Sequence, residues 1–315
     1  MPKYREHLPQ MDGGIFLTDG GMETTLIFHD KIELPHFAAF DLMMDGTGIE
    51  VLRKYYSAHA SIASANGLGF ILESPTWRAN PEWGEKLGYG EGALGEVNRA
   101  AIALMQELRE KYETLRSPMV ISGCVGPRGD GYDPGQVMTE DEAETYHEEQ
   151  IGCFRNSEAD FVTGVTITNT PEAIGIVRAA CRQGLPVVIS FTVETDGRLP
   201  TGESLEGAIK AVDSATDSAT AYYMINCAHP THFAAVLATS EPWIKRLRGV
   251  RANASRLSHA ELNEAPTLDE GNPRELGAQY AELLRRHPHI NVLGGCCGTD
   301  HRHIEEIAKA CAAPA

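Results

Sequence analysis

The sequence predicts an α/β protein built as a single (β/α)8 TIM barrel. Short apolar runs rich in β-branched residues alternate with longer amphipathic stretches along the 315 residues, and eight such runs can be counted. Eight strand and helix units in a chain of this length are typical of a closed parallel barrel. Near-continuous apolar runs, such as residues 185–192, fit strands that are covered on both faces.

The predicted strands are spaced widely enough for a helix between each pair. They are residues 15–19, 69–73, 119–123, 160–166, 186–193, 221–227, 249–254 and 290–294. No linker rich in Pro, Ser or Gly and no low-complexity stretch divides the chain. We therefore expect residues 1–315 to form one domain.

Capping signals at several predicted helix starts support this frame. Thr139 and Glu142 have the spacing of a capping box, in which each side chain satisfies a backbone amide that the first helical turn leaves free. Ser204 is expected to cap a helix through Ala211, and Asp300 the last helix, residues 302–311. A further helix is expected over residues 94–109.

Composition excludes several classes of function. The formal net charge is −17, and no Lys/Arg cluster suited to nucleic acid or an anionic membrane is present. The N-terminus has no apolar signal segment, and no run approaches the roughly 18 apolar residues of a membrane helix. We expect a cytoplasmic protein without nucleic-acid or membrane partners, whose assembly into a homo-oligomer the sequence leaves open. Seven cysteines without a small-scaffold spacing predict reduced thiols.

Two adjacent cysteines, Cys296 and Cys297, follow the last predicted strand and stand between glycines. Neighbouring side chains of a strand point to opposite faces, so both sulfurs can reach one metal ion only where the strand has become a turn. Glycine favours such a turn, and the flanking glycines are Gly294, Gly295 and Gly298. Cys227 also follows a predicted strand, and the ends of parallel barrel strands meet at one face. The pattern predicts a Cys227, Cys296 and Cys297 zinc site with one open position.

The other cysteines and two nearby histidines are weaker candidates as ligands. Cys124 belongs to a different Gly-rich loop, and Cys153, Cys181 and Cys311 fall in helical stretches, where cysteine serves as a small apolar residue. His229 and His232 follow Cys227 and could contribute to the site, although histidines near a helix start more often make structural hydrogen bonds.

Three thiolates make zinc electron-rich and a poor Lewis acid toward carbonyls. Such a site can instead bind a substrate thiol, deprotonate it and leave it nucleophilic. The chemistry this favours is alkyl transfer to sulfur.

Asp19 could hold the ammonium group of an amino-acid substrate or merely shape its turn. Trp77 and Trp83 could contact an onium cation through a ring face. Packing within the loop is an equal alternative for Trp77 and the favoured one for Trp83.

Nucleotide chemistry is not supported. Residues 90–95 match the Gly-x-Gly-x-x-Gly spacing, but no predicted strand precedes them. A phosphate-binding loop ending in Gly-Lys-Ser/Thr is also missing from the sequence.

The chain resembles the homocysteine S-methyltransferase family in three motifs. They are residues 19–24 (DGGMET), Asn226-Cys227 and residues 294–298 (GGCCG), and the likeness covers nearly the whole chain. The resemblance implies a (β/α)8 barrel in which Cys227, Cys296 and Cys297 bind the zinc that activates homocysteine. It also implies that Asp19 helps to hold the homocysteine amino group, with Asn226 beside the metal in the substrate site.

One position departs from the family pattern. Val165 stands where the family usually has a glutamate that shares the substrate amine with the aspartate. A valine cannot pair with an ammonium group, so either Glu194 or Glu73 takes that role or the acceptor is another thiol. The family's cobalamin and folate routes use additional modules, which favours a small onium donor here: S-methylmethionine, S-adenosylmethionine, betaine or a dimethylsulfonio acid.

We therefore predict a zinc-dependent S-methyltransferase that moves a methyl group from such a donor to a small-molecule thiol. Homocysteine is the expected acceptor and methionine biosynthesis the expected setting. Two alternatives stay open: the same chemistry on a different thiol or selenol, and a non-catalytic barrel that binds zinc or thiols.

Overall fold

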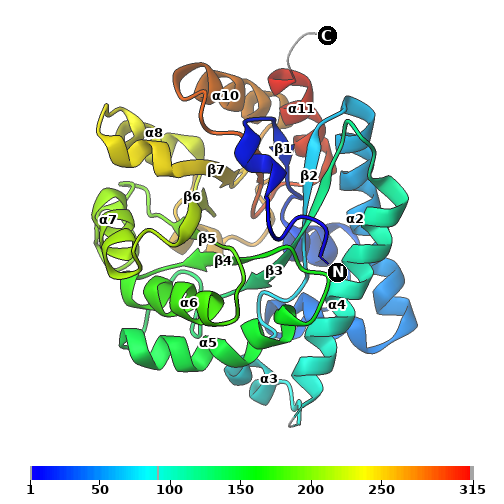
Figure 1. The fold of residues 1–315 in the computed structure, drawn as a ribbon. Helices are drawn as coiled ribbons and strands as arrows, with labels where there is room; N and C mark the ends of the chain where they lie inside the picture. The colour runs from blue at the N-terminus through cyan, green and yellow to red at the C-terminus, as the bar shows by residue number, and fades with distance from the viewer. Residues whose placement is uncertain (1, 91, 313–315) are drawn as a thin grey trace.

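The computed structural model describes residues 2–90 and 92–312 and shows a closed barrel of eight parallel strands in the order β1 to β8 (Figure 1). Each strand pairs with its neighbours in sequence, and β1 also pairs with β8. This confirms the predicted fold class. The strands are β1 (Phe16–Leu17), β2 (Gly69–Glu73), β3 (Met119–Val125), β4 (Phe161–Ile167), β5 (Val187–Thr192), β6 (Thr220–Asn226), β7 (Leu247–Ala252) and β8 (Val292–Gly295).

Helices surround the barrel on its outer side (Figure 1). They are α1 (Met22–Thr24), α2 (Gly46–Asn66), α3 (Pro81–Lys86), α4 (Ala93–Tyr112), α5 (Glu140–Arg155), α6 (Thr170–Arg182), α7 (Leu205–Ala215), α8 (Pro230–Leu237), α9 (His259–Glu264), α10 (Pro273–Arg286) and α11 (His301–Cys311). Short 3-10 helices lie at Pro9–Asp12, Pro35–Phe37, Ala39–Met44 and Pro242–Arg246, and a π-helical turn at Thr25–His29. None of the helices in the described part of the chain is long and apolar enough to span a bilayer.

The predicted caps are present. Thr139 and Glu142 form the capping box of α5, and Ser204 accepts a hydrogen bond from the amide of Gly207 in the first turn of α7. Asp300 caps α11. The prediction for Cys124 needs correction, because β3 continues to Val125 and places this cysteine in a buried strand and not in a loop.

Barrel-facing side chains change from apolar to polar along the strands. One apolar cluster includes Phe16, Ile71, Val120, Phe161, Val188 and Val292, with Leu8 from the N-terminal segment packed against it. Two residues further along four of these strands, on the same face, lie Glu73, Ser122, Thr163 and Ser190. A second, larger cluster fills the space between the sheet and the helices. The barrel thus rests on an apolar core and carries polar groups toward the carboxyl ends of its strands.

Candidate metal and active site

The two cysteine segments lie at the carboxyl ends of β6 and β8. After β8 the backbone turns, with the amide of Thr299 donating to the Cys296 carbonyl over 3.1 Å and Gly298 at φ +77°. A positive φ favours glycine, so Gly298 is the residue that permits this turn. Gly294 and Gly295 were also expected to form the turn, but they belong to β8, where a Cβ atom would collide with Thr18 or Thr299.

The three predicted ligands converge. The Sγ atoms of Cys227, Cys296 and Cys297 all lie within 4.8 Å of one another, and among the described residues they form the one group with metal-binding geometry. Cys227 is buried, and the other two are partly buried. Neither His229 nor His232 belongs to the group: His229 caps α8 through Thr231, and His232 lies 2.9 Å from the Arg256 carbonyl.

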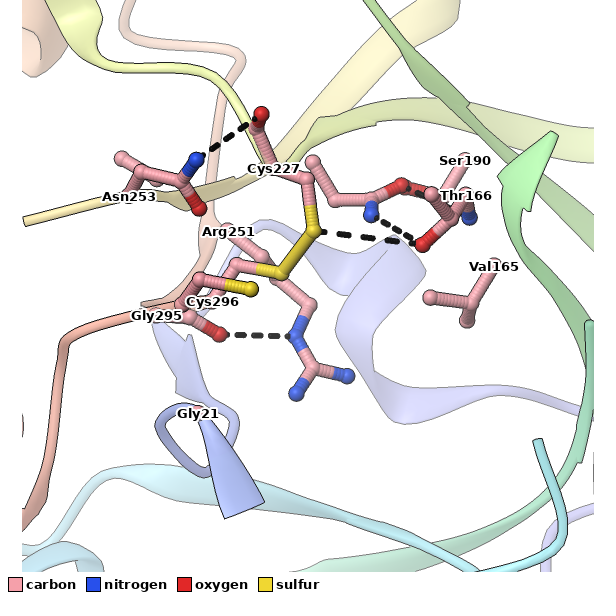
Figure 2. The surroundings of a disulfide bond; sticks show 12 residues. Gly21, Val165, Thr166, Ser190, Cys227, Arg251, Asn253, Gly295 and Cys296 are labelled. Carbon is pink, nitrogen blue, oxygen red and sulfur yellow. Dashed lines mark hydrogen bonds between the residues drawn. A yellow bond between two sulfur atoms is a disulfide. The ribbon is translucent and has the colours of Figure 1, made fainter. Parts of the chain in front are cut away.

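In the structure Cys227 and Cys296 are joined as a disulfide (Figure 2). Cys297 is a free thiol. The sequence predicted reduced thiols, and this prediction is wrong for Cys227 and Cys296. The convergence that was expected to form a metal site also brings their Cα atoms to 5.3 Å, a separation at which a disulfide can form. Reduction of this pair leaves three thiols around one point. Three sulfurs suit a soft metal ion, and a catalytic site of this kind keeps a fourth position for substrate.

Cys297 is held by a chain of polar contacts. The Tyr132 hydroxyl lies 3.3 Å from its sulfur, and the Tyr132 ring stacks on His259 with 3.9 Å between centroids. Burial raises the pKa of the Cys297 thiol, and the hydrogen bond from Tyr132 acts in the opposite direction. A bound metal ion would favour the thiolate much more strongly.

His259 connects the predicted Glu194 to the cluster. Its Nε2 lies 2.6 Å from the Cys227 carbonyl oxygen, and its Nδ1 lies 3.1 Å from Glu194 Oε1. Both partners are acceptors, so the two hydrogen bonds together need an imidazolium ring or a protonated Glu194. The Glu194 side chain is 36% exposed and lies behind His259, on the backbone side of Cys227. A substrate contact by Glu194 stays a prediction.

Asn226 holds a strained segment of β4 beside Cys227. Its Oδ1 accepts from the Thr166 amide over 3.0 Å and from the Ser190 hydroxyl over 2.6 Å, and its Nδ2 donates to Thr166 Oγ1 over 2.7 Å. Thr166 has φ +62° and Cys227 has φ +53°, and a positive φ is costly for residues other than glycine. The β4–β5 register shifts between Gly164 and Ile167. Asn226 therefore stabilises a bulge that brings Thr166 Oγ1 to 3.9 Å from Cys227 Sγ (Figure 2).

Asp19 and Glu73 face a buried arginine. Arg251 donates to Asp19 Oδ1 over 2.6 Å, lies 3.5 Å from Glu73 Oε2 and donates through Nε to the Gly295 carbonyl over 3.2 Å. Desolvation raises the pKa of Glu73 to about 7, and Arg251 opposes that rise. Arg251 balances the buried charge of these carboxylates. Its contacts connect β7 with the end of β1, with β2, and with β8, which leads into the cysteine loop. Substrate contacts by Asp19 and Glu73 stay predictions.

Trp77 lies at the mouth of the barrel, next to the guanidinium group of Arg78. Its indole N–H donates to the Val165 carbonyl over 3.0 Å, and the Arg78 guanidinium lies 4.7 Å from its ring centroid. Arg78 also lies 3.8 Å from the Trp83 ring, which is buried on α3. The Val165 side chain, 8% exposed, brings an apolar group to this part of the site. Contact between Trp77 and an onium donor stays a prediction.

Several residues of the site were not selected from the sequence. Arg251 carried a usable signal, since it is a charged residue inside the apolar run of β7. Thr166 directly follows Val165, the position that departs from the family pattern. Its positive φ depends on the bulge in β4, which the sequence does not display. Tyr132 lies between β3 and α5, and His259 is the first residue of α9. Both are far in sequence from the three cysteines of the cluster, and only the folded barrel places them beside it.

Comparison with known proteins places the chain in a family. A model of the homocysteine S-methyltransferase family matches residues 16–311. The homocysteine methyltransferase MmuM from Escherichia coli is similar in its metallated form, with a TM-score of 0.70 and 17% identity over 94% of this chain and 96% of that one. The oxidized form of the same protein has a TM-score of 0.74 and 18% identity over 96% of this chain and 97% of that one. At such identities the structures show a shared fold, and the family match adds the rest: the chain is an enzyme of the methyltransferase type that belongs to the homocysteine S-methyltransferase family.

Proposed function

We propose that this enzyme transfers a methyl group from a small onium donor to the sulfur of homocysteine, with zinc held by Cys227, Cys296 and Cys297. The observation that carries the proposal is the convergence of three sulfurs within 4.8 Å at the mouth of a barrel of this family. When bound there, zinc lowers the pKa of an acceptor thiol and keeps it as a thiolate at neutral pH.

The residues around the cluster have distinct tasks in this proposal. Asn226 and Thr166 fix the backbone at Cys227, and His259 holds its carbonyl. Tyr132 supports Cys297. These contacts keep the ligands in place before substrate arrives, which matters because small displacements of reacting groups are costly in rate.

The transfer itself is a displacement at the methyl carbon. The thiol proton passes to solvent as the acceptor binds, and the acceptor sulfur forms a bond to the methyl carbon. The bond from that carbon to the donor sulfonium or ammonium centre breaks, and its electron pair stays on the donor, which leaves as a neutral thioether or amine. Trp77 is our candidate for contact with the donor cation.

The proposal also concerns the setting of the enzyme. A reducing compartment keeps Cys227 and Cys296 as thiols, so we place the enzyme in the cytoplasm. Its product from homocysteine is methionine, which assigns it to methionine biosynthesis.

A panel assay tests this function. Reduced, zinc-loaded protein is incubated with homocysteine and, in turn, S-methylmethionine, S-adenosylmethionine, betaine and dimethylsulfoniopropionate, and methionine is detected by mass spectrometry. At least one donor should give turnover that Cys297→Ser loses and Cys181→Ser keeps, since Cys181 is exposed on α6. No turnover with any donor at full zinc occupancy would overturn the proposal.

The acceptor is tested in the same assay. Because Val165 brings no charge to the site, cysteine and selenohomocysteine are included as alternative acceptors. X-ray absorption at the zinc edge should show a fourth sulfur or a selenium ligand with the true acceptor. Turnover with one of these and none with homocysteine would reassign the acceptor and keep the chemistry.

A further inference from the structure

Both carboxylate oxygens of Asp19 already accept a hydrogen bond inside the protein. Its Oδ1 accepts from Arg251 over 2.6 Å, and its Oδ2 accepts from the Tyr55 hydroxyl over 3.1 Å. Asp19 is 2% exposed and Arg251 is 7% exposed. A substrate ammonium group that reached Asp19 would have to compete with a buried guanidinium for the same oxygens, and the two cations would repel each other.

Another carboxylate, that of Glu23, lies on the segment that packs against the cysteine loop. Gly21 is so close that an added Cβ would collide with the Cys296 carbonyl, and Thr24 Oγ1 accepts from the Gly298 amide over 3.2 Å. Glu23 lies between these two contact points on α1. The segment from Gly21 to Thr24 therefore covers one side of the cysteine loop.

The Glu23 carboxylate has no cationic partner within ion-pair distance in the described part of the chain; its hydrogen bond is to its own backbone amide. Burial raises its pKa, Asp19 adds to the rise, and Arg78 and Arg251 oppose it. Its charge in turn raises the pKa of Cys297 and Tyr132. Glu23 itself is partly buried and stands between Gly21 and Thr24, the two residues that contact the cysteine loop.

We propose that Glu23 binds the ammonium group of an amino-thiol acceptor whose sulfur lies at the Cys227, Cys296 and Cys297 cluster. The inference rests on the proposed function and names the residue that selects the acceptor class. An ammonium group offers three N–H donors to a carboxylate, whereas a sulfonium or quaternary ammonium centre offers none and suits an aromatic face. Glu23 is therefore matched to an ammonium group, such as that of the acceptor, and not to the onium centre of the donor.

Equilibrium binding tests this assignment without turnover. Reduced, zinc-loaded protein is titrated by calorimetry with homocysteine and with 4-mercaptobutyrate, which has the same thiol chain and carboxylate but no amine. The wild type should bind homocysteine about 10 to 100 times more tightly, the range expected for one charge-assisted hydrogen bond in a buried site. Glu23→Gln should lose this preference and bind 4-mercaptobutyrate as the wild type does.

Two further variants complete the test. Glu23→Asp keeps the charge on a shorter side chain and should retain part of the preference, and Glu33→Gln, at an exposed position, should behave as wild type. Zinc content and melting temperature are measured for each. The inference is overturned if Glu23→Gln still prefers homocysteine, if it binds homocysteine and 4-mercaptobutyrate more weakly to the same degree, or if it loses zinc. Failure of methyl transfer in the panel assay would overturn the proposed function instead, because the binding preference is measured separately.

Discussion

Arg251 donates to Asp19 across 2.6 Å, and both side chains are buried where β7 and β1 end. The same guanidinium lies 3.5 Å from Glu73 and holds the carbonyl of Gly295, the residue before the first cysteine of the tandem pair. A single arginine thus neutralises acidic groups beneath the site and fixes the strand that presents Cys296. Any account of substrate binding at Asp19 has to include this cation.

Breaking this pair should destabilise the protein strongly. Arg251→Met leaves Asp19 and Glu73 without a counter-charge in a buried site, at an expected cost of about 3–5 kcal/mol in the free energy of unfolding. Asp19→Asn should also destabilise the protein. The double variant should lose less free energy of unfolding than the two single variants lose together. Urea denaturation measures all three. Glu206→Gln, which removes the exposed Lys210–Glu206 pair on α7, should leave the free energy of unfolding almost unchanged. Strict additivity of Asp19→Asn and Arg251→Met would contradict the coupling.

Metal uptake should require reduction. The Cys227–Cys296 disulfide removes two of three thiolate ligands, so protein isolated without reductant should take up little zinc. After treatment with tris(2-carboxyethyl)phosphine, about one zinc per chain should bind, as measured by plasma mass spectrometry. Cys296→Ser and Cys297→Ser should both lose it. Cys181→Ser serves as the matched control, and equal zinc loss in that variant would argue against the three-cysteine site.

Asn226 should matter through Thr166. Asn226→Ala removes three hydrogen bonds and leaves the Thr166 amide and the Ser190 hydroxyl unpaired in a buried bulge. We expect a loss of about 2–4 kcal/mol in stability and weaker zinc binding, because the strained backbone next to Cys227 is released. Chemical denaturation and zinc competition measure the two effects. Asn156→Ala, on the exposed end of α5, should change neither; a stable Asn226→Ala protein with full zinc affinity would show that the bulge needs no support.

Glu73 should make stability depend on pH. Desolvation raises its pKa from 4.5 to about 7, so between these values the folded protein binds more protons than the unfolded chain. The contribution of Glu73 is therefore fully present below pH 4.5 and is lost as the pH rises through 7, a change of about 3 kcal/mol. Glu73→Gln has no such titration. The difference in unfolding free energy, wild type minus Glu73→Gln, should fall between pH 5 and pH 8 in urea titrations, and a flat or rising difference would contradict the raised pKa.

Much of the fold could be predicted because its signals are local. Each of the eight apolar runs corresponds to an observed strand, although β1 is only two residues long and β3 runs past its expected end. The caps at Thr139, Ser204 and Asp300 depend on residues three or fewer positions apart, which a sequence displays directly. Strand alternation with helices then leaves the parallel barrel as the natural closure.

The sequence by itself also determined the cysteine cluster, since the ends of parallel barrel strands must meet and Cys227, Cys296 and Cys297 stand at two of them. Only the tertiary structure decided what surrounds it. Closing the barrel brought Arg251 onto Asp19, Tyr132 onto Cys297, and Glu23 beside the cysteine loop. These relationships join residues that are far apart in the chain, and a side chain's partner there depends on register, bulges and loop paths that no local pattern encodes.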